Sequence, residues 1–258
     1  MERTPVYFMR GLNSVGDEIL RLGPIPCGTY HDRFLRPFKD LKMLPLLGMG
    51  RGSAESMGER ALKALKADPQ YQKAEKIHLV GHSLGGLVAR YLVHDPEVRS
   101  KTLSVVTIGT PHRGTPAAEP SQTHNFLSQF IYELVRAAPE KAAENYQTAR
   151  LEGAMAFAQR YPDVEGVHYA SLIGHRPYKK LPLGFQILEQ RNNVKRQPSD
   201  GLIPAKSQRW GQVLDEVSLD HLEQIGFCGH VTPWERVRFS LEFQRQCRIL
   251  KAYWRSFL

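Results

Sequence analysis

Ser83 is the residue of this chain whose surroundings best suit nucleophilic chemistry. It lies in the run Gly-His-Ser-Leu-Gly at 81–85, between an apolar segment at 77–80 and the small and apolar residues of a predicted helix. A G-x-S-x-G pattern between a strand and a helix is typical of a strained turn that exposes the serine hydroxyl. We therefore predict that Ser83 is a nucleophile. The alternative is a glycine-rich turn with an incidental serine.

A serine hydroxyl needs a base that takes its proton and an acid that orients the base. Where this turn occurs, the three residues follow in the order serine, acid, histidine. Asp200, in a Pro-Ser-Asp-Gly turn, is the best candidate for the acid, and of the ten histidines only His221 and His230 follow it. His221 comes after a strand-like segment at 212–219 and is the first choice as base, with His230 in reserve.

Several polar residues near these positions have other interpretations. Asp200 could be an ordinary turn residue, since Ser-Asp-Gly is common turn chemistry, and Asp215 or Asp220 would then be the acid. His82 and His112 are expected to hold loops together through hydrogen bonds rather than to transfer protons.

The oxyanion of an acyl-transfer intermediate needs two backbone donors. In sites with this turn, one donor comes from the loop after the first strand and the other from the residue after the nucleophile. The β-branched and aromatic run at 6–9 predicts that strand, and a tight loop follows it. We therefore assign the oxyanion hole to the amides of Leu12 and Leu84.

Strand-like and helical segments alternate along the chain and must position these residues. The near-continuous apolar run at 103–108 predicts a strand buried on both faces, and Ser56-x-x-Glu59 predicts the start of a helix that ends by Asp68-Pro69. Further predicted elements are a short helix within 30–41, a strand at 43–49, a strand at 167–171 and a helix that opens with a capping box at 232–235. The alternation predicts an α/β fold with a mostly parallel, doubly wound sheet and a site at its carboxyl edge.

Length and composition limit the function classes. A chain of 258 residues can form one large core, so we expect a single domain over 1–258. The net charge of +9 is scattered and lacks zinc-ligand spacing or a nucleic-acid motif, so no nucleic-acid partner is expected. No apolar run is long enough for a transmembrane segment, and the three cysteines argue against a fully disulfide-linked exported protein. The first ten residues lack a signal-peptide pattern, which favours a cytoplasmic location; the protein would be secreted if the sequence is a mature form.

Longer motifs strengthen the interpretation. Gly-His-Ser-Leu-Gly-Gly-Leu-Val-Ala-Arg-Tyr and, about twenty residues on, Val-Thr-Ile-Gly-Thr-Pro-His-Arg-Gly-Thr-Pro resemble the bacterial triacylglycerol lipases of the α/β-hydrolase superfamily. The likeness continues in Ser-Asp-Gly-Leu-Ile-Pro at 199–204 and Asp-His-Leu-Glu-Gln-Ile at 220–225. It implies an α/β-hydrolase fold with a helical lid insertion, Asp200 as the triad acid and His221 as the base.

The resemblance also raises the question of a metal. Family members often bind calcium through an acidic residue two positions after the triad histidine, and Glu223 matches that ligand. Phe227 stands where a polar ligand is expected, and residues 176–186 offer no carboxylate for the upstream ligand. Calcium needs several oxygen donors, so we predict no bound metal and no cofactor.

The resemblance places a lid before the strand at 167. Apolar residues at helical spacing predict an amphipathic helix over 123–137, within candidate lid or cap helices at 123–160. Phe130 and Leu134 are its predicted substrate-binding residues, because an apolar face closed over Ser83 would form an acyl-chain groove. An ordinary helix packed on the sheet is the alternative.

The last segment carries an apolar stripe opposite basic residues. The stripe, which we expect to pack on the sheet, consists of Phe243, Cys247, Leu250, Trp254 and Phe257. The alternative is a transient contact with an anionic lipid interface.

Together, the motifs and the resemblance imply a serine hydrolase that cleaves carboxylic ester bonds of lipids through an acyl-enzyme, with a lipid or small-molecule ester as substrate. A short-chain carboxylesterase or thioesterase with the same triad is the alternative within enzymes. A catalytically silent binding scaffold is the alternative from another class, because a fold alone does not guarantee activity.

Overall fold

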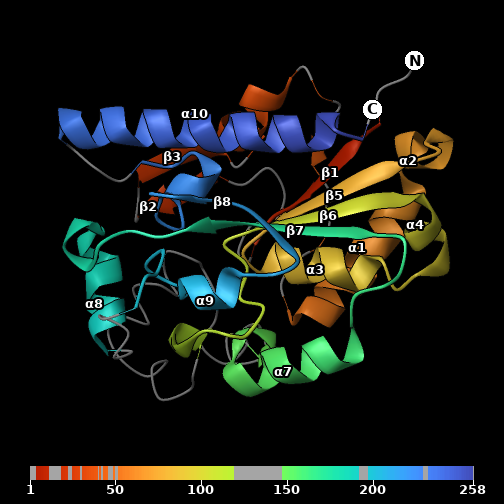
Figure 1. Cartoon of the computed structure of the whole chain (residues 1–258), viewed down its shortest axis with the longest axis horizontal. Coiled ribbons are helices and arrows are strands. Elements are labelled where there is room, and N and C mark those ends of the chain that lie inside the picture. Colours follow the sequence, from red (N-terminus) through yellow and green to blue (C-terminus); the bar gives the residue numbers. More distant parts are fainter. Residues whose placement is uncertain are drawn as a thin grey trace.

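A six-stranded, all-parallel sheet runs through the molecule (Figure 1). In spatial order its strands are β4 Met43–Pro45, β1 Val6–Met9, β5 Ile77–His82, β6 Thr102–Ile108, β7 His168–Gly174 and β8 Gln212–Val217. The earlier strands β1 and β4 extend the sheet on one side of β5 and the later strands β6, β7 and β8 on the other, which is the doubly wound arrangement that the sequence predicted. A two-stranded antiparallel ribbon, β2 Ile19–Leu22 and β3 Ile25–Thr29, lies outside this sheet.

The computed structural model describes residues 4–11, 19–22, 25–29, 31–39, 41, 43–45, 49, 52–118, 147–191, 197–228 and 232–257. The predicted oxyanion donor Leu12, the reserve base His230, the helix over 123–137 and its residues Phe130 and Leu134 lie outside these ranges.

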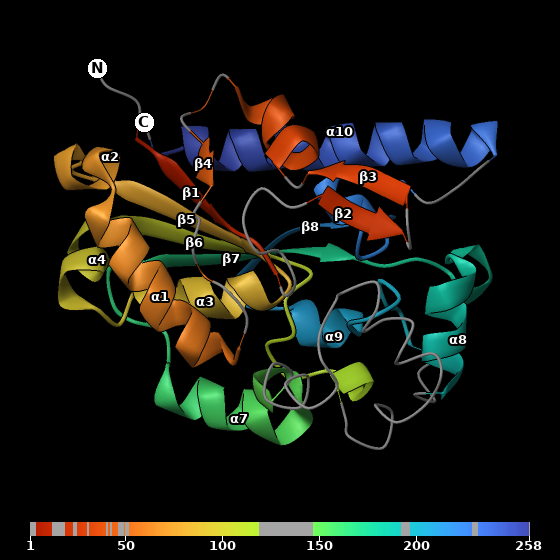
Figure 2. The ribbon, with the colours of Figure 1, turned by 180° about the vertical axis from the view of Figure 1, so that it is seen from behind.

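Helices cover both faces of the sheet, as Figures 1 and 2 show from opposite sides. The helices are α1 Ala54–Ala67, α2 Pro69–Lys73, α3 Leu84–Leu92, α4 Pro96–Lys101, α7 Leu151–Arg160, α8 Leu183–Arg191, α9 Ala205–Gln208 and α10 Pro233–Arg255. The single turns are η1 His31–Leu35, η2 Arg36–Phe38, η3 Pro116–Ala118, η5 Gln147–Ala149, η6 Tyr178–Lys180 and η7 Glu223–Ile225.

The period of two along each strand divides the core into two layers. In β1, Tyr7 and Met9 pack with residues of α1 and α3, whereas Val6 and Phe8 pack with residues of η1, η2 and α10. Both sides of the strand are therefore buried, which explains its continuous apolar composition. The sheet becomes a rigid support for the loops at its carboxyl edge.

The predicted start of α1 is wrong because two serines, Ser53 and Ser56, could each cap the helix. The first long helix begins at Ala54, not after Ser56, because Ser53 is the N-cap and accepts a hydrogen bond from the Ser56 amide at 3.2 Å. The Ala54 amide in turn donates to Thr148 Oγ1 at 3.0 Å, a distant partner that no local pattern reveals.

Three further predictions need correction in part. The segment 30–41 forms a π turn and a 3₁₀ turn rather than an α-helix, and the strand predicted at 43–49 is described only over Met43–Pro45. The helix at 232–235 does begin with Thr232 as N-cap, but its side chain makes no capping hydrogen bond. Glu235 pairs with arginines instead of closing the capping box.

The C-terminal helix α10 packs on the sheet through the predicted stripe. Cys247, Leu250 and Trp254 are buried in the core on that face. The expectation that this stripe is core is confirmed. None of the helices in the described ranges is long and apolar enough to cross a membrane.

Candidate active site

Ser83 occupies the turn between β5 and α3 in a strained conformation. Its φ of 56° and ψ of −131° place it outside the regions that L-residues favour, and it is the sole non-glycine residue with positive φ in the described part of the chain. Its amide donates to the carbonyl of Ile108 at 2.9 Å, which fixes the turn against the end of β6. The side chain is half-buried, so solvent or a ligand can reach it. Such strain is typical of functional positions.

Two glycines allow other backbone segments to approach this turn closely. A Cβ on Gly11 would lie 2.7 Å from Ser83 Cβ and 3.1 Å from Ser83 Oγ. A Cβ on Gly85 would lie 2.4 Å from the carbonyl oxygen of Met9. The distances of 2.7 and 2.4 Å are shorter than Cβ contacts allow, so glycine is required at both positions. The loop after β1 therefore touches the Ser83 side chain, directly before the predicted oxyanion donor Leu12.

The second predicted donor, Leu84, is the first residue of α3 and is buried. Amides in the first turn of a helix lack intrahelical partners and face developing negative charge favourably. The position of Leu84 directly after Ser83 is thus compatible with the oxyanion role, which stays a prediction.

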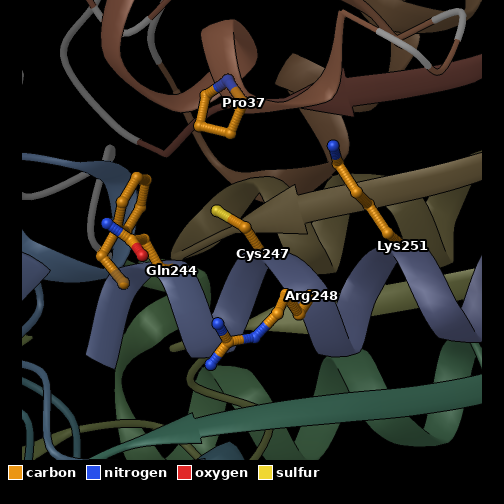
Figure 3. Close-up of a pocket in the computed structure, with 6 residues that line it drawn as sticks. Pro37, Gln244, Cys247, Arg248 and Lys251 are labelled. Atoms are coloured by element: carbon orange, nitrogen blue, oxygen red, sulfur yellow. The ribbon is translucent and has the colours of Figure 1, made fainter. Parts of the chain in front are cut away.

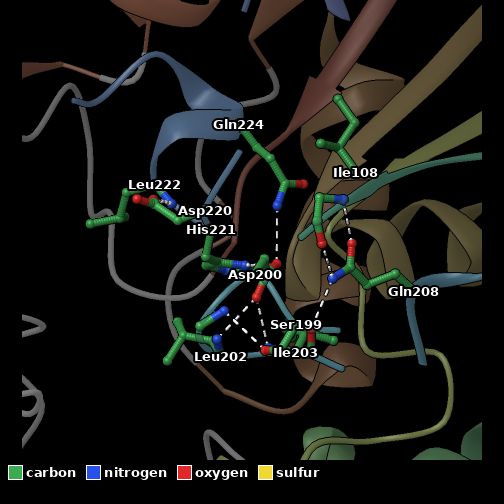
Figure 4. Close-up of polar contacts among 12 residues, drawn as sticks. Ile108, Ser199, Asp200, Leu202, Ile203, Gln208, Asp220, His221, Leu222 and Gln224 are labelled. Atoms are coloured by element: carbon green, nitrogen blue, oxygen red, sulfur yellow. Dashed lines mark hydrogen bonds and ion pairs between the residues drawn. The ribbon is translucent and has the colours of Figure 1, made fainter. Parts of the chain in front are cut away.

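The structure brings Asp200 and His221 together from two loops at the carboxyl edge of the sheet. Asp200 Oδ2 accepts a hydrogen bond from His221 Nδ1 at 2.8 Å, and both side chains are buried (Figure 4). The His221 amide also donates to the Asp200 carbonyl at 2.8 Å. This double contact fixes the imidazole with Nδ1 toward the carboxylate, which leaves Nε2 available for proton transfer.

Backbone and side-chain donors surround the Asp200 carboxylate. Oδ1 accepts from the amides of Leu202 at 3.0 Å and Ile203 at 2.7 Å, and Oδ2 accepts from Gln224 Nε2 at 3.0 Å (Figure 4). The loop itself is held by Gln208, whose Nε2 donates to the Ile203 carbonyl at 2.8 Å. The carboxylate is therefore fully satisfied and held in one orientation despite its burial.

Gln224 was missed by the sequence analysis, although it contacts the predicted acid directly. It lies in the turn η7, three residues after His221, and its carbonyl accepts a hydrogen bond from Gln246 Nε2 of α10 at 2.6 Å. A Cβ on Gly109 would lie 2.7 Å from Gln224 Oε1, so the end of β6 packs closely on the same amide. Gln224 lies within the family-like motif at 220–225, but nothing in that motif shows which residue its side chain contacts, so its role was not predicted.

His82 connects the nucleophile turn to the histidine loop. Its Nε2 lies 3.0 Å from the carbonyl oxygen of His221, and the two rings lie 4.6 Å apart between centroids. Burial, with His221 nearby, holds the pKa of His82 well below its ordinary value, so the ring is neutral and Nε2–H donates. The predicted loop-holding role of His82 is confirmed.

His112 has the same kind of role in the loop after β6. Its Nε2 lies 3.0 Å from Thr107 Oγ1, and its amide donates to the carbonyl of Ser207 at 3.0 Å. Burial, followed by the nearby charge of Arg90, lowers the pKa of His112 well below its ordinary value. A buried neutral imidazole that ties this loop to α9 agrees with the prediction.

The alternative acids have other partners. Asp215 Oδ2 pairs with Arg245 at 2.6 Å. Asp220 Oδ1 accepts from the amides of Leu222 at 3.0 Å and Glu223 at 2.9 Å, which shapes the turn after His221. The geometry therefore favours Asp200 over both alternatives as the partner of the His221 imidazole.

Glu223, which matches the position of a calcium ligand in the resembling family, is buried and engaged with arginines. Its carboxylate lies 3.5 Å from Arg176 and also pairs with Arg238, and both arginines pair with Glu235 at 2.7 and 2.8 Å. Guanidinium groups thus supply positive charge where a cation would have to bind. No group of three or more potential ligands among His, Cys, Asp and Glu was found in the described ranges. These residues do not fit a calcium site.

Comparison with known proteins agrees with this architecture. The family described as "PGAP1-like alpha/beta domain" matches residues 59–202, more than half of the chain. A triacylglycerol lipase of Vibrio cholerae is 27% identical over 234 residues, which cover 78% of this chain and 74% of the relative.

Solved structures share the fold at lower identity. The metagenomic carboxyl esterase MGS0156 superposes with a TM-score of 0.72 at 16% identity, covering 99% of this chain and 76% of that one. The Staphylococcus hyicus lipase gives a TM-score of 0.65 at 14% identity, covering 98% and 95% of the two chains. The chain therefore belongs to the PGAP1-like alpha/beta domain family, with a lipase-like α/β-hydrolase fold.

Proposed function

We propose that this protein hydrolyses carboxylic esters of lipids, such as acylglycerols, through an acyl-enzyme on Ser83. The observation that carries the proposal is the 2.8 Å contact between Asp200 Oδ2 and His221 Nδ1, at the same sheet edge as the strained Ser83 turn. A nucleophile, a base and an orienting acid are the groups that acyl transfer requires.

In the first half-reaction, His221 Nε2 takes the proton of the Ser83 hydroxyl while Ser83 Oγ attacks the ester carbonyl carbon. The carbonyl oxygen becomes an oxyanion that accepts from the amides of Leu84 and Leu12, a contribution of roughly 3 to 4 kcal/mol per donor in comparable sites. The bond to the alkoxy oxygen then breaks, and His221 returns the proton to the leaving alcohol.

In the second half-reaction, His221 Nε2 takes a proton from water while the water oxygen attacks the acyl carbon. The bond to Ser83 Oγ breaks, the proton passes from His221 to Ser83, and a carboxylic acid leaves. Asp200 stays ionised throughout and stabilises the imidazolium form of His221.

The names of the relatives support an ester substrate, but they point to different classes of ester. The Vibrio cholerae relative is named a triacylglycerol lipase, whereas one structural neighbour is named a carboxyl esterase. A short-chain carboxylesterase with the same residues is therefore the second candidate.

A chain-length series of p-nitrophenyl esters, from acetate to palmitate, separates the two candidates and tests the proposal. We expect kcat/KM to rise with acyl length and Ser83→Ala to abolish turnover of every ester. A maximum at acetate or butyrate would show a short-chain esterase. Absence of turnover on all esters, with a folded protein, would contradict ester hydrolysis.

A further inference from the structure

The outward face of α10 carries an apolar surface that no part of the described chain covers. Trp234, Val237 and Leu241 are 84%, 53% and 61% exposed. Their spacing of three and four residues places them in one row along the helix, on the side opposite the buried Leu250 and Trp254. We call this row the α10 apolar row. Exposed large apolar side chains in a continuous row mark an interaction surface.

The second half of the same outward face is basic. Arg245, Arg248 and Arg255 continue the row at helical spacing, and all three are exposed. The two acidic residues of α10 are paired: Glu235 with Arg176 and Arg238, and Glu242 with Arg245 at 3.7 Å, while Glu242 also accepts from the Ser218 amide at 3.0 Å. Asp215 and Glu242 already compensate the charge of Arg245. The outward face of α10 therefore combines the apolar row with the cationic side chains of Arg248 and Arg255.

A hollow of about 250 Å³ adjoins the basic half, between η2 and α10 (Figure 3). Its lining residues are Pro37, Phe243, Gln244, Cys247, Arg248 and Lys251. In Figure 3, Lys251 points from α10 toward the side of Pro37 and Arg248 points the other way, so cations flank the hollow in both directions. None of the predicted triad residues lines it.

The apolar row lies at the end of the molecule that carries the candidate site. Figures 1 and 2 both show the N-terminal half of α10 reaching past the sheet on the side of α8, where the strands have their carboxyl ends. Arg238, in this half of α10, pairs with Glu223 two residues after His221. An external surface that binds this half of α10 would therefore lie close to the loop that carries His221.

From this geometry we infer that the outward face of α10 docks on an anionic lipid surface. Trp234, Val237 and Leu241 enter the interface, and Arg248 and Arg255 bind lipid phosphates. Apolar insertion together with several basic residues is what reversible binding to anionic bilayers requires, and the net charge of +9 favours the same partner. The choice of a lipid surface rests on the proposed function, but binding can be measured without activity.

Co-sedimentation with vesicles tests the inference. Wild-type protein should sediment with vesicles of equimolar phosphatidylcholine and phosphatidylglycerol, and much less with pure phosphatidylcholine. The combined variant Trp234→Ser, Val237→Ser, Leu241→Ser should bind the mixed vesicles at least about tenfold more weakly, because it loses most of the inserted apolar area. Arg248→Gln with Arg255→Gln should also lose at least about tenfold and reduce the salt dependence.

Met155→Ser is the matched control, because Met155 is 63% exposed on α7, which lies on the other side of the sheet. Its vesicle binding should equal that of wild type. Thermal unfolding and the hydrolysis of soluble p-nitrophenyl butyrate should stay unchanged in all variants, which separates docking from folding and from catalysis.

Equal binding of wild type and the apolar-row variant would overturn the inference. So would a wild-type dimer in size-exclusion chromatography that the same substitutions dissociate without any change in vesicle binding, since a second copy would then cover this face. Vesicle binding as expected from a protein that hydrolyses no ester would support the docking surface and contradict the proposed function alone.

Discussion

His82 Nε2 lies 3.0 Å from the carbonyl oxygen of His221, so the residue before the candidate nucleophile holds the loop of the candidate base. This contact crosses from β5 to the segment after β8 and fixes the loop of the candidate base relative to the turn of the candidate nucleophile. A displacement of such groups by about 1 Å costs up to about a hundredfold in rate.

We expect His82→Phe to lower kcat on soluble esters by about ten- to a hundredfold with little change in KM, because it keeps the ring but removes the donor. His82→Gln, which retains an N–H donor, should recover part of the loss. His94→Phe is the control, since His94 Nε2 also bonds a backbone carbonyl, that of Pro162 at 2.9 Å, but His94 lies past the end of α3 opposite to Ser83. Wild-type kinetics in His82→Phe would contradict the positioning role.

The buried pairing of Arg176 with Glu223 leads to a prediction about stability. Arg176→Met should lower the free energy of unfolding by about 3 kcal/mol or more, because it leaves Glu223 buried with only part of its compensation. Arg209→Met breaks the exposed pair with Glu216 and should cost at most about 1 kcal/mol. Urea unfolding measures both, and equal losses would contradict the account.

The pairing of Glu223 with Arg176 and Arg238 also predicts the response to metal removal. Since guanidinium groups engage Glu223, treatment with EDTA should leave the melting temperature and the ester hydrolysis unchanged. A large fall in melting temperature that added calcium reverses would show that a cation site exists after all.

Asp220 predicts how stability changes with pH. Burial, and then the nearby charge of Glu223, raise the pKa of Asp220 to about 8. Arg176 and Arg238 are already paired with Glu223 and Glu235, so neither is left to compensate a charge on Asp220 fully. The native state therefore holds a proton that the unfolded chain releases near the ordinary carboxyl value. The stability that this proton contributes to the native state is complete below the ordinary carboxyl pKa and is lost as pH rises toward the raised pKa of Asp220.

Asp220→Asn cannot ionise, so it should gain stability relative to wild type as pH rises from about 5 to about 8. Melting temperatures of both proteins across this range give the difference directly. A difference that does not change with pH would show that Asp220 is ionised in the native protein.

The elements that carry the site could be predicted because each has a local signal. The run before Ser83 is apolar on both faces of the sheet, and the glycines at 81 and 85 mark the close contacts of the turn. The turn around Asp200 was recognisable from Ser-Asp-Gly, and the family resemblance placed the acid there. The contact of Asp200 with His221 then follows from parallel strands that end at one edge.

The remaining features depend on contacts between distant segments. Gln224 reaches Asp200 only because η7 packs on the ends of β6 and β7, and no pattern in the sequence shows this. Ser53 replaces Ser56 as the helix cap for a similar reason, since Thr148 fixes where the helix starts. On α10 the apolar stripe predicted from the sequence does not include Trp234, Val237 and Leu241, whose exposure only the structure reveals.

The central claim is that Ser83 is the nucleophile and that Asp200 and His221 activate it. The most direct measurement is covalent labelling by a fluorophosphonate, followed by mass spectrometry of the digested protein. Labelling should add one phosphonyl group to Ser83, fall by roughly 10³-fold or more in rate in His221→Ala, and fall less in Asp200→Asn. A folded wild-type protein that stays unlabelled, or a label on another residue, would contradict the account.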